Sequence, residues 1–491
     1  MHLTKSKYIA GRQCERRLWL TCHAPDLPTP APQTAQAWFD LGAVVGSRAR
    51  DLFAGGVLVS EAPWEHSQAV ERTRRLMQDA TVGAVFEAAF EHEGVRVRVD
   101  VLERQAEGRW GMCEVESSTR VKDVHLEDVA VQRFVVSGAG VQLGSVEVMV
   151  INNQYVRGDD GIESARLFVR TDVTAETSAR QPEIPGHLQR FAEVLSQRAA
   201  PLVEPSEHCS SPYGCEFWAH CTAAKPADWI FNMPRLGGRQ RDTLRRGGIE
   251  RIRDIPDSFP LHSVQQRVRA AWRAGALQID AGLATALATL GPPADYLDFE
   301  TAAPAIPLYP GTRPYQQVPF QWSLHRLRGD GAIEHLEFLA QGAADPRAAF
   351  AESLILALRE PNGPVLVWSG FEKRILRELA HLLPQHASAL RALQARIVDL
   401  LPVTRNHVYH PDFGGGFSIK GVAPALVPGL SYDDLDRVAD GGAAADALGQ
   451  LASGAISSAE EVERLRRALL AYCERDTLAM LEVHRALREL A

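Results

Sequence analysis

The segment Tyr296–Thr301 reads YLDFET and directly follows the residues PPAD. If this segment forms a β-strand, Asp298 and Glu300 point to one face because side chains alternate along a strand, and the apolar Leu297 and Phe299 pack on the other. Two neighbouring carboxylates repel each other unless a divalent cation lies between them, and carboxylate oxygens suit Mg²⁺ or Mn²⁺. An isolated Asp-x-Glu pattern also fits an edge strand with a solvated acidic face, so the acids downstream decide between the two interpretations.

Further acids follow in two later segments. Val365–Trp368 is a short apolar run and Phe371–Leu379 has helical periodicity, which places Glu372 at a strand-to-helix junction. A carboxylate there can reach the carboxyl end of a sheet, where open α/β folds place their sites. In the last, strongly amphipathic helix, Tyr472 and Asp476 are four residues apart and share one face. Singly, each also fits a structural role, as a core tyrosine or a helix-surface acid; jointly they favour a functional site.

The order of these motifs resembles that of the DEDD exonucleases of the DnaQ-like group, tyrosine subtype, across residues 291–491. Phe320–His325 and Ile333–Leu339 are expected to form further strands, followed by a helix over Pro346–Leu358. This order fits the RNase H-like α/β sheet of that group. The resemblance also implies a two-metal site for Mg²⁺ or Mn²⁺, in which Tyr472 orients the attacking water. The metal ligands that it implies are Asp298, Glu300, Glu372 and Asp476.

One position departs from that family. Glu372 stands where aspartate is usual, and its extra methylene displaces the carboxylate and can alter the metal spacing. Asp399, in RIVDLL, and Asp446, in GGAAADAL, are the reserve candidates.

The N-terminal part carries a second acidic pattern. From Ala84 to Ser117 the sequence alternates between apolar and polar residues with polar turns, which predicts an antiparallel meander. Asp100 is expected to end one strand of the meander, and Glu114 and Glu116 share a face on the next. The elements expected before and after the meander are helices within residues 1–60, broken at Pro25–Pro32, a helix over His125–Val136 and a strand over Val146–Asn152.

This arrangement resembles the PD-(D/E)XK nuclease core, and within it the RecB-like nucleases that carry an iron-sulfur cluster, over residues 1–222. The resemblance makes Asp100 and Glu114 metal ligands and Gln132 the glutamine of the following helix. Glu116 stands where that family has lysine, and a carboxylate cannot supply the positive charge. Lys122 follows Glu116 by an even number of residues, so its side chain would point to the same face and reach the site if the strand continued. Val136 stands where relatives often have tyrosine.

Four cysteines frame the N-terminal domain. Cys209, Cys215 and Cys221 are separated by five residues each, and Cys14 lies near the start of the chain. Four thiolates are the number that a [4Fe-4S] cluster requires, and one early with three late cysteines is the layout of the iron-sulfur nucleases. The spacing is wider than the usual CxxC of zinc sites, so the cluster is favoured and zinc is the alternative. The remaining cysteines are expected to be small core residues: Cys22, Cys113 and Cys473.

Residues 223–290 are expected to form a helical connector, with a weak helix-hairpin-helix pattern as the alternative to a plain linker. Arg235–Arg273 holds ten arginines against four acids. These arginines could contact a phosphate backbone, or they could form the solvated face of a helix.

The whole chain bounds the remaining possibilities. Its length of 491 residues predicts two or three domains, and its apolar content is ordinary for a globular protein. Its net charge of -8 gives no global electrostatic argument for nucleic-acid binding. No long apolar run or secretion signal is present in the sequence, so we expect a cytoplasmic protein without a membrane partner. The expected architecture is α/β: a RecB-like domain over 1–222, the connector over 223–290 and a DnaQ-like domain over 291–491.

Three functions follow as hypotheses. The first is a metal-dependent 3'-5' exonuclease on DNA or RNA, whose iron-sulfur domain binds or opens the strand. The second is a nucleic-acid-binding scaffold in which both nuclease sites have decayed, motivated by Glu116 and Glu372. The third keeps the N-terminal site active through Lys122.

Overall fold

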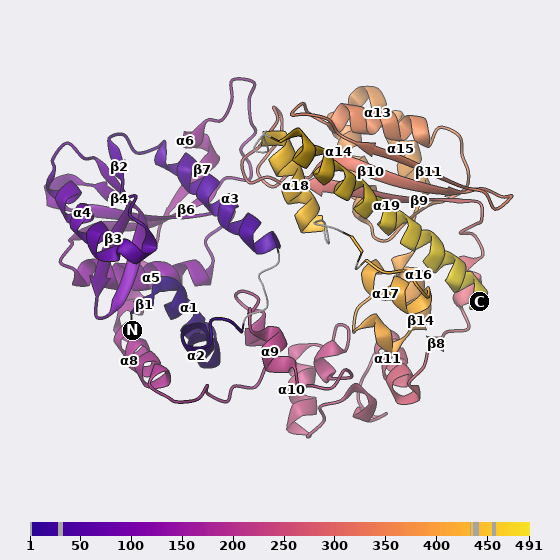
Figure 1. The fold of residues 1–491 in the computed structure, drawn as a ribbon, viewed down its shortest axis with the longest axis horizontal. Coiled ribbons are helices and arrows are strands. Elements are labelled where there is room, and N and C mark those ends of the chain that lie inside the picture. Colours follow the sequence, from indigo (N-terminus) through magenta and orange to yellow (C-terminus); the bar gives the residue numbers. More distant parts are fainter. Residues whose placement is uncertain (1, 28–32, 433, 436–440, 454–457) are drawn as a thin grey trace. The chain divides into compact units, whose positions relative to one another are not determined.

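The computed structural model describes residues 2–27, 33–432, 434–435, 441–453 and 458–491. It forms two compact units, each with its own sheet and helices (Figure 1). Unit 1 consists of Met1–Ala224 and Pro304–Gln316, and unit 2 consists of Lys225–Ala303 and Gln317–Ala491. The expectation of an α/β protein is therefore confirmed.

Unit 1 is built on a seven-stranded sheet of order β2-β3-β4-β5-β6-β7, with β1 paired to β4. Its strands are β1 (Leu3–Thr4), β2 (Gly56–Leu58), β3 (Ala84–His92), β4 (Val95–Arg104), β5 (Trp110–Glu116), β6 (Leu143–Ile151) and β7 (Phe168–Asp172). β3, β4 and β5 are consecutive antiparallel strands, and β5 and β6 run parallel around a helical crossover. The predicted meander is therefore confirmed.

Helices surround this sheet. Those of unit 1 are α1 (Lys5–Gln13), α2 (Glu15–His23), α3 (Gln33–Arg50), α4 (His66–Gln78), α5 (Asp123–Gly138), α6 (Ser164–Leu167), α7 (Thr174–Arg180), α8 (Ile184–Leu195) and α9 (Trp218–Thr222). Of these, α4 and α5 pack directly against the strands of the sheet. On α5, the buried Val129 and Val136 pack in one core with Val97 and Val99 of β4. Helix α5 also carries Asp128, whose charge acts on Glu114 of β5 and whose Oδ2 accepts from Gln132.

The segment Pro304–Gln316 leaves unit 2 after its first long strand and packs in unit 1. Arg157 exchanges main-chain hydrogen bonds with Thr312 and Gly311, at 3.0 and 2.8 Å. The Tyr315 hydroxyl donates to the carbonyl oxygen of Ser117, the residue after β5. The chain therefore passes between the units three times.

Unit 2 contains a five-stranded sheet of order β11-β10-β9-β12-β13, in which β10 runs antiparallel to both neighbours and β9, β12 and β13 run parallel. Its strands are β9 (Ala294–Ala302), β10 (Val318–Leu327), β11 (Ile333–Leu339), β12 (Val365–Val367) and β13 (Ile397–Asp399). A short pair, β8 (Gln278–Ile279) and β14 (Val408–Tyr409), lies outside this sheet. YLDFET is the central strand, not an edge strand.

The two faces of the unit 2 sheet are covered differently. Leu297 and Phe299 face a core that includes Phe350 of α13 (Arg347–Ala357) and Leu376 of α14 (Phe371–Leu382). The opposite face meets α19 (Ala459–Glu489), since the Tyr296 hydroxyl lies 2.8 Å from Nδ1 of His484. Alternation along β9 therefore turns Asp298 and Glu300 toward α19. The remaining helices of unit 2 are α10 (Gly238–Arg246), α11 (Ser263–Ala274), α12 (Leu283–Leu287), α15 (Ala387–Arg396), α16 (Leu401–His407), α17 (Ile419–Leu426) and α18 (Gly441–Ser453).

Residues 225–290 share a hydrophobic core with the rest of unit 2. Trp229, Leu244 and Val268 are buried there together with Leu366 of β12 and Met480 of α19. This part of the expected connector is thus folded into unit 2 and is not a plain linker.

Candidate functional site

Four carboxylates converge in unit 2, from one strand and two helices. Asp298 and Glu300 lie opposite Ser323 and Gln321 of β10, on the face that meets α19. Glu372 lies in the first turn of α14, directly after β12, as predicted from the strand-to-helix junction. Asp476 projects from α19. Asp298 is half-buried, and the other three carboxylates are buried, with relative exposures of 3% to 8%.

The pKa values of these carboxyls report their mutual repulsion. Burial raises the pKa of Asp298 well above its usual range, and the charges of Asp476, Glu300 and Glu372 raise it further. Burial raises the pKa of Glu372 to about 8, with a further contribution from the charge of Asp399. Like charges this close require protonation or a bound cation.

Two tyrosines and a lysine surround Asp476. Burial raises the pKa of Asp476, while hydrogen bonds from the Tyr432 and Tyr472 hydroxyls and the charge of Lys420 lower it. The Tyr432 hydroxyl donates to Asp476 Oδ1 at 2.7 Å, and Lys420 Nζ lies 4.6 Å from the centre of the Tyr472 ring. Tyr432 and Lys420 escaped sequence analysis because neither lies in a motif with the acids.

Cys473 is buried as expected, but it also lies at the acidic site. Its Sγ is 3.6 Å from Asp298 Oδ2, and one ligand atom from each of Cys473, Asp298 and Glu300 lies within 4.8 Å of the others. Burial and the neighbouring carboxylates raise the pKa of this thiol well above its usual range, so it stays protonated.

The residues present fit a hard divalent cation. Glu372 Oε2 is buried without a hydrogen-bond partner among the described residues, and a buried lone carboxylate oxygen is costly unless it meets a proton, a water or a metal. The donors here are carboxylate oxygens, which suit Mg²⁺ or Mn²⁺.

The reserve candidates lie differently. Asp399 ends β13, accepts a 2.9 Å hydrogen bond from the Leu401 amide, and lies close enough to Glu372 to raise its pKa. The side chain of Asp446 lies outside the described residues.

A second acidic cluster lies in unit 1. Asp100 does not end its strand, because β4 continues to Arg104, and its Oδ2 accepts a 2.8 Å hydrogen bond from the Val115 amide. Burial raises the pKa of Asp100 to about 6, of Glu114 to about 8 and of Glu116 to about 7. Neighbouring acids raise these pKa values further, and they include Asp128 of α5, which sequence analysis missed.

The cation in this cluster comes from α1. Lys5 Nζ contacts Glu114 Oε1 and lies 3.1 Å from Asp128 Oδ2. The condition under which β5 would carry Lys122 to the site is not met, since β5 ends at Glu116 and Lys122 immediately precedes α5. The charge of Lys122 nevertheless lowers the pKa of Glu116.

Gln132 of α5 is fully buried beside the same cluster. Its Nε2 donates to Asp128 Oδ2 at 3.4 Å, whereas its Oε1 and the Oε2 of Glu114 have no hydrogen-bond partner in the described part of the chain. These orphaned oxygens are compatible with a cation or water between the strand and the helix.

The four predicted cysteines come together in unit 1. Cys14 lies between α1 and α2, and its thiol lines one small cavity with those of Cys209, Cys215 and Cys221. Within the described residues, no three of these sulfurs lie within 4.8 Å of one another. Burial raises the pKa of Cys215 to about 11, so its thiolate requires a positive partner such as a metal.

Many arginines of the expected basic stretch are neutralised by acids. The ion pairs are Arg251 and Arg253 with Asp228, Arg269 and Arg273 with Asp257, and Arg267 with Asp280. These pairs favour the structural alternative for the arginine-rich stretch.

One histidine pair adjoins the unit 2 site. His325 and His335 stack across β10 and β11 with ring centres 4.6 Å apart, and Glu474 lies 3.7 Å from His335 Nδ1. Hydroxyl groups of Thr477 and Ser323 contact the rings, at 2.8 and 2.9 Å. One ligand atom from each of His325, His335 and Glu474 lies within 4.8 Å of the others, so this trio is a second group in unit 2 that could hold a metal ion.

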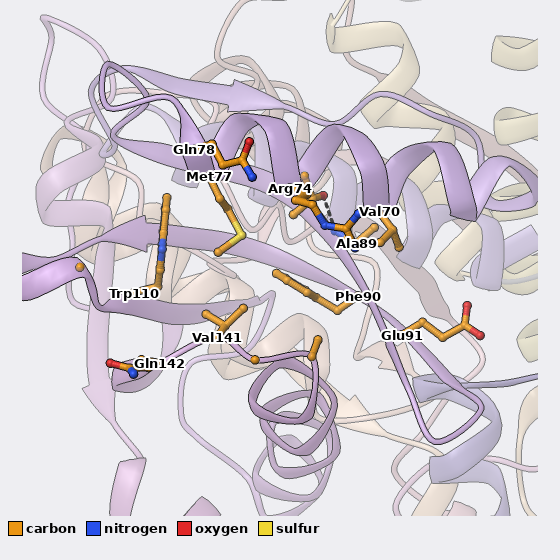
Figure 2. A pocket seen from close by; sticks show the side chains of 14 residues that line it. Val70, Arg74, Met77, Gln78, Ala89, Phe90, Glu91, Trp110, Val141 and Gln142 are labelled. Carbon is orange, nitrogen blue, oxygen red and sulfur yellow. Dashed lines mark hydrogen bonds between the residues drawn. The ribbon is translucent and has the colours of Figure 1, made fainter.

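A cavity of about 650 Å³ in unit 1 is separate from these clusters (Figure 2). Met77, Phe90, Trp110 and Val141 give it apolar walls, with Arg74 at one side. None of the predicted site residues lines it.

Comparison with known proteins gives one partial match. Residues 295–418 are similar to a family described as a domain of unknown function (DUF2779). The matched segment contains Asp298, Glu300 and Glu372, and it ends before α19 with Tyr472 and Asp476. No curated protein matches the chain. Within the described residues, no helix has the length and apolar character needed to cross a membrane.

Proposed function

We propose that this chain is a metal-dependent nuclease, a 3'-5' exonuclease acting on DNA or RNA, with its principal hydrolytic site in unit 2. The observation that carries the proposal is the convergence of Asp298, Glu300, Glu372 and Asp476. The acids come from positions spread over nearly 180 residues, yet they repel one another in one buried place. Buried like charges of this kind mark functional sites more often than structural ones.

The topology of unit 2 supports the proposed RNase H-like architecture. Its strand order places a central β9 between the antiparallel β10 and the parallel β12. Asp298 lies on that central strand, while Tyr472 and Asp476 lie on the last helix, which is the arrangement expected from the DEDD resemblance. The 3' polarity of cleavage rests on that resemblance.

The carboxylates would hold two Mg²⁺ or Mn²⁺ ions, which when bound activate water and stabilise the leaving oxygen of the phosphodiester. Tyr472 can orient that water, because its hydroxyl hydrogen-bonds to Asp476 and burial raises its pKa, which keeps it a donor. Lys420 adds positive charge beside the same ring, where a phosphate would gain from it.

Unit 1 is proposed to be a RecB-like iron-sulfur domain that binds or processes the strand. Its four thiols support a metal centre. The four thiols line one small cavity, and the five-residue spacing of Cys209, Cys215 and Cys221 with an early Cys14 favours a [4Fe-4S] cluster, with zinc as the alternative.

A cleavage assay tests the unit 2 proposal. Anaerobically purified protein should shorten 3'- or 5'-end-labelled DNA or RNA oligonucleotides when Mg²⁺ or Mn²⁺ is added. Asp298→Ala and Asp476→Ala should each abolish shortening, whereas Glu460→Gln, at an exposed acid on the same helix as Asp476, should leave it unchanged. Activity that survives Asp298→Ala together with Asp476→Ala would reject the assignment.

The scaffold hypothesis has a specific observation in its favour, which is Glu116 in place of a lysine on β5. It predicts salt-sensitive binding of oligonucleotides without cleavage under any divalent metal. The same assay therefore separates the two functions.

A further inference from the structure

A second cavity in unit 1, of about 820 Å³, has an excess of positive charge on its walls. The charged residues that line it are Lys5, Lys7, Arg50, Arg96 and Arg98, against Glu61 and Glu87. Arg50 pairs with Glu87 at 3.4 Å, Arg96 with Glu91 at 2.9 Å, and Lys5 with Glu114 and Asp128. Among the described residues, Lys7 and Arg98 are therefore the lining cations that no carboxylate pairs with. The whole chain has a net charge of -8, so this concentration of cations runs against the balance of the protein. A concave positive surface attracts anions because its low-dielectric walls focus the field.

Arg98 is the clearest of these cations. Its hydrogen bonds in the described part of the chain all go to main-chain carbonyl oxygens, of Glu61 at 3.1 Å and of Ala62 and Glu87 at 3.5 Å. The guanidinium is therefore held in place without a hydrogen-bonded carboxylate to neutralise it. The adjacent His66 shows the resulting field, since burial and the charges of Arg96 and Arg98 lower its pKa.

Lys5 joins this cavity to the acidic cluster of unit 1. Its side chain is part of the cavity wall, and its ammonium contacts Glu114 and lies 3.1 Å from Asp128 Oδ2. Glu87, on the same wall, raises the pKa of Asp100 by its charge. It sits at an irregular position of β3, with φ of 56°, where the pairing with β4 skips one residue. The cavity thus lies beside Glu114, whose Oε2 has no hydrogen-bond partner among the described residues.

We propose that this cavity binds the phosphodiester backbone of a nucleic-acid strand, and that Lys5 holds one phosphate against the Asp100 and Glu114 carboxylates. Lys5 then supplies, from α1, the positive charge that Glu116 does not supply from β5. The proposal deepens the role of unit 1 and rests on nucleic acid being the substrate.

Binding of fluorescent single-stranded DNA and RNA oligonucleotides of one sequence tests it. The parent is the full chain with Asp298→Asn, with Ca²⁺ in place of Mg²⁺ to prevent cleavage, and anisotropy is followed against salt. Lys5→Met and Lys7→Gln should each weaken binding several-fold and reduce the slope of log K against log salt by about one. Arg198→Gln, which removes an exposed cation of unit 1 outside the cavity, should change neither quantity.

Two further variants guard against misfolding, and the cleavage assay separates this inference from the unit 2 proposal. Lys5→Arg should retain most of the affinity, and Glu116→Lys should restore part of what Lys5→Met loses. Parent-like affinity and slope in both Lys5→Met and Lys7→Gln would overturn the inference, as would equal losses in Arg198→Gln. Cleavage that survives in the unit 2 variants, together with cavity-dependent binding, would reject only the exonuclease. Loss of cleavage in the unit 2 variants, together with binding that does not depend on the cavity residues, would reject only the cavity.

Discussion

The Tyr432 hydroxyl donates a 2.7 Å hydrogen bond to Oδ1 of Asp476, across 44 positions of the chain. Asp476 is buried, and this bond is one of the interactions that lower its pKa against the effect of burial. A hydrogen bond that favours the ionised form of a carboxyl group also favours its binding of a cation. Tyr432 therefore belongs to the site although it lies in no acidic motif.

Tyr432→Phe should weaken metal binding more than it slows the reaction of the metal-bound protein. The loss of one hydrogen bond to a charged group corresponds to about 1.5–3 kcal/mol. We expect roughly tenfold weaker Mn²⁺ binding by calorimetry and a matching rise in the Mg²⁺ concentration for half-maximal cleavage. Tyr472→Phe is the matched comparison and should mainly lower the maximal rate; identical behaviour of the two variants would contradict the separate roles.

Asp298→Asn should stabilise the metal-free protein while abolishing cleavage. Asp298 is repelled by three other carboxylates, so neutralising it removes unfavourable charge from the folded state. We expect a gain of roughly 1–2 kcal/mol, which corresponds to about 2–8 °C in the midpoint of thermal unfolding at pH 8 in EDTA. Glu460→Gln provides the control, and an unchanged or lower midpoint for Asp298→Asn would show that the carboxylates do not repel one another.

The metal-free protein should lose stability as the pH rises from about 6.5 to 8. Folding raises the pKa of Glu114 and Glu372 to about 8 and of Glu116 to about 7, so the folded state binds more protons than the unfolded state in this window. The buried His125, His325 and His484 act oppositely, because their pKa is lowered to about 4. Unfolded histidines are about half deprotonated at pH 6.5, so part of this effect remains there, and above that pH it is smaller than the effect of the three carboxyls.

Urea unfolding at several pH values, with EDTA or with saturating Mg²⁺, measures this dependence. Mg²⁺ should flatten the slope above pH 6.5, since a cation holds the carboxylates ionised. A slope that is the same in EDTA and in Mg²⁺ would contradict cation binding at both acidic clusters.

Replacing one cluster cysteine should remove the metal and loosen unit 1. Cys14→Ser is expected to eliminate the brown colour and the bound iron of anaerobically purified protein, and to lower the unfolding midpoint, because the centre would tie together segments nearly 200 residues apart. Cys22→Ser, at a cysteine that does not line the small cavity, should retain both properties. Zinc in place of iron in the parent protein would reject the cluster.

The sequence predicted which residues share a face wherever the spacing along one strand or one helix determines it. Alternation set the common face of Asp298 and Glu300, and the spacing of Tyr472 and Asp476 set their helix face. Lys5 could not be found in this way, because it meets Glu114 across 109 positions, and one lysine at the start of a helix has no distinctive pattern.

Strand ends were less predictable than strands. Asp100 was expected at the end of a strand, yet β4 continues to Arg104 because Val101 and Leu102 pack in the core beyond it. Lys122 would point to the same face as Glu116 only if β5 continued to it, because side chains alternate along a strand. The chain turns before α5, so this alternation does not reach Lys122.

The docking of residues 304–316 in unit 1 sets an order of events during protein synthesis. Domains usually fold as they leave the ribosome, starting from the N-terminus. Here the sheet of unit 1 is translated by residue 172, but the strip that carries Tyr315 to the Ser117 carbonyl follows about 140 residues later, after β9. A fragment that ends at residue 224 would therefore lack Ile306 and Tyr315, which pack against the core of unit 1. The apolar surface that they cover would be exposed to solvent.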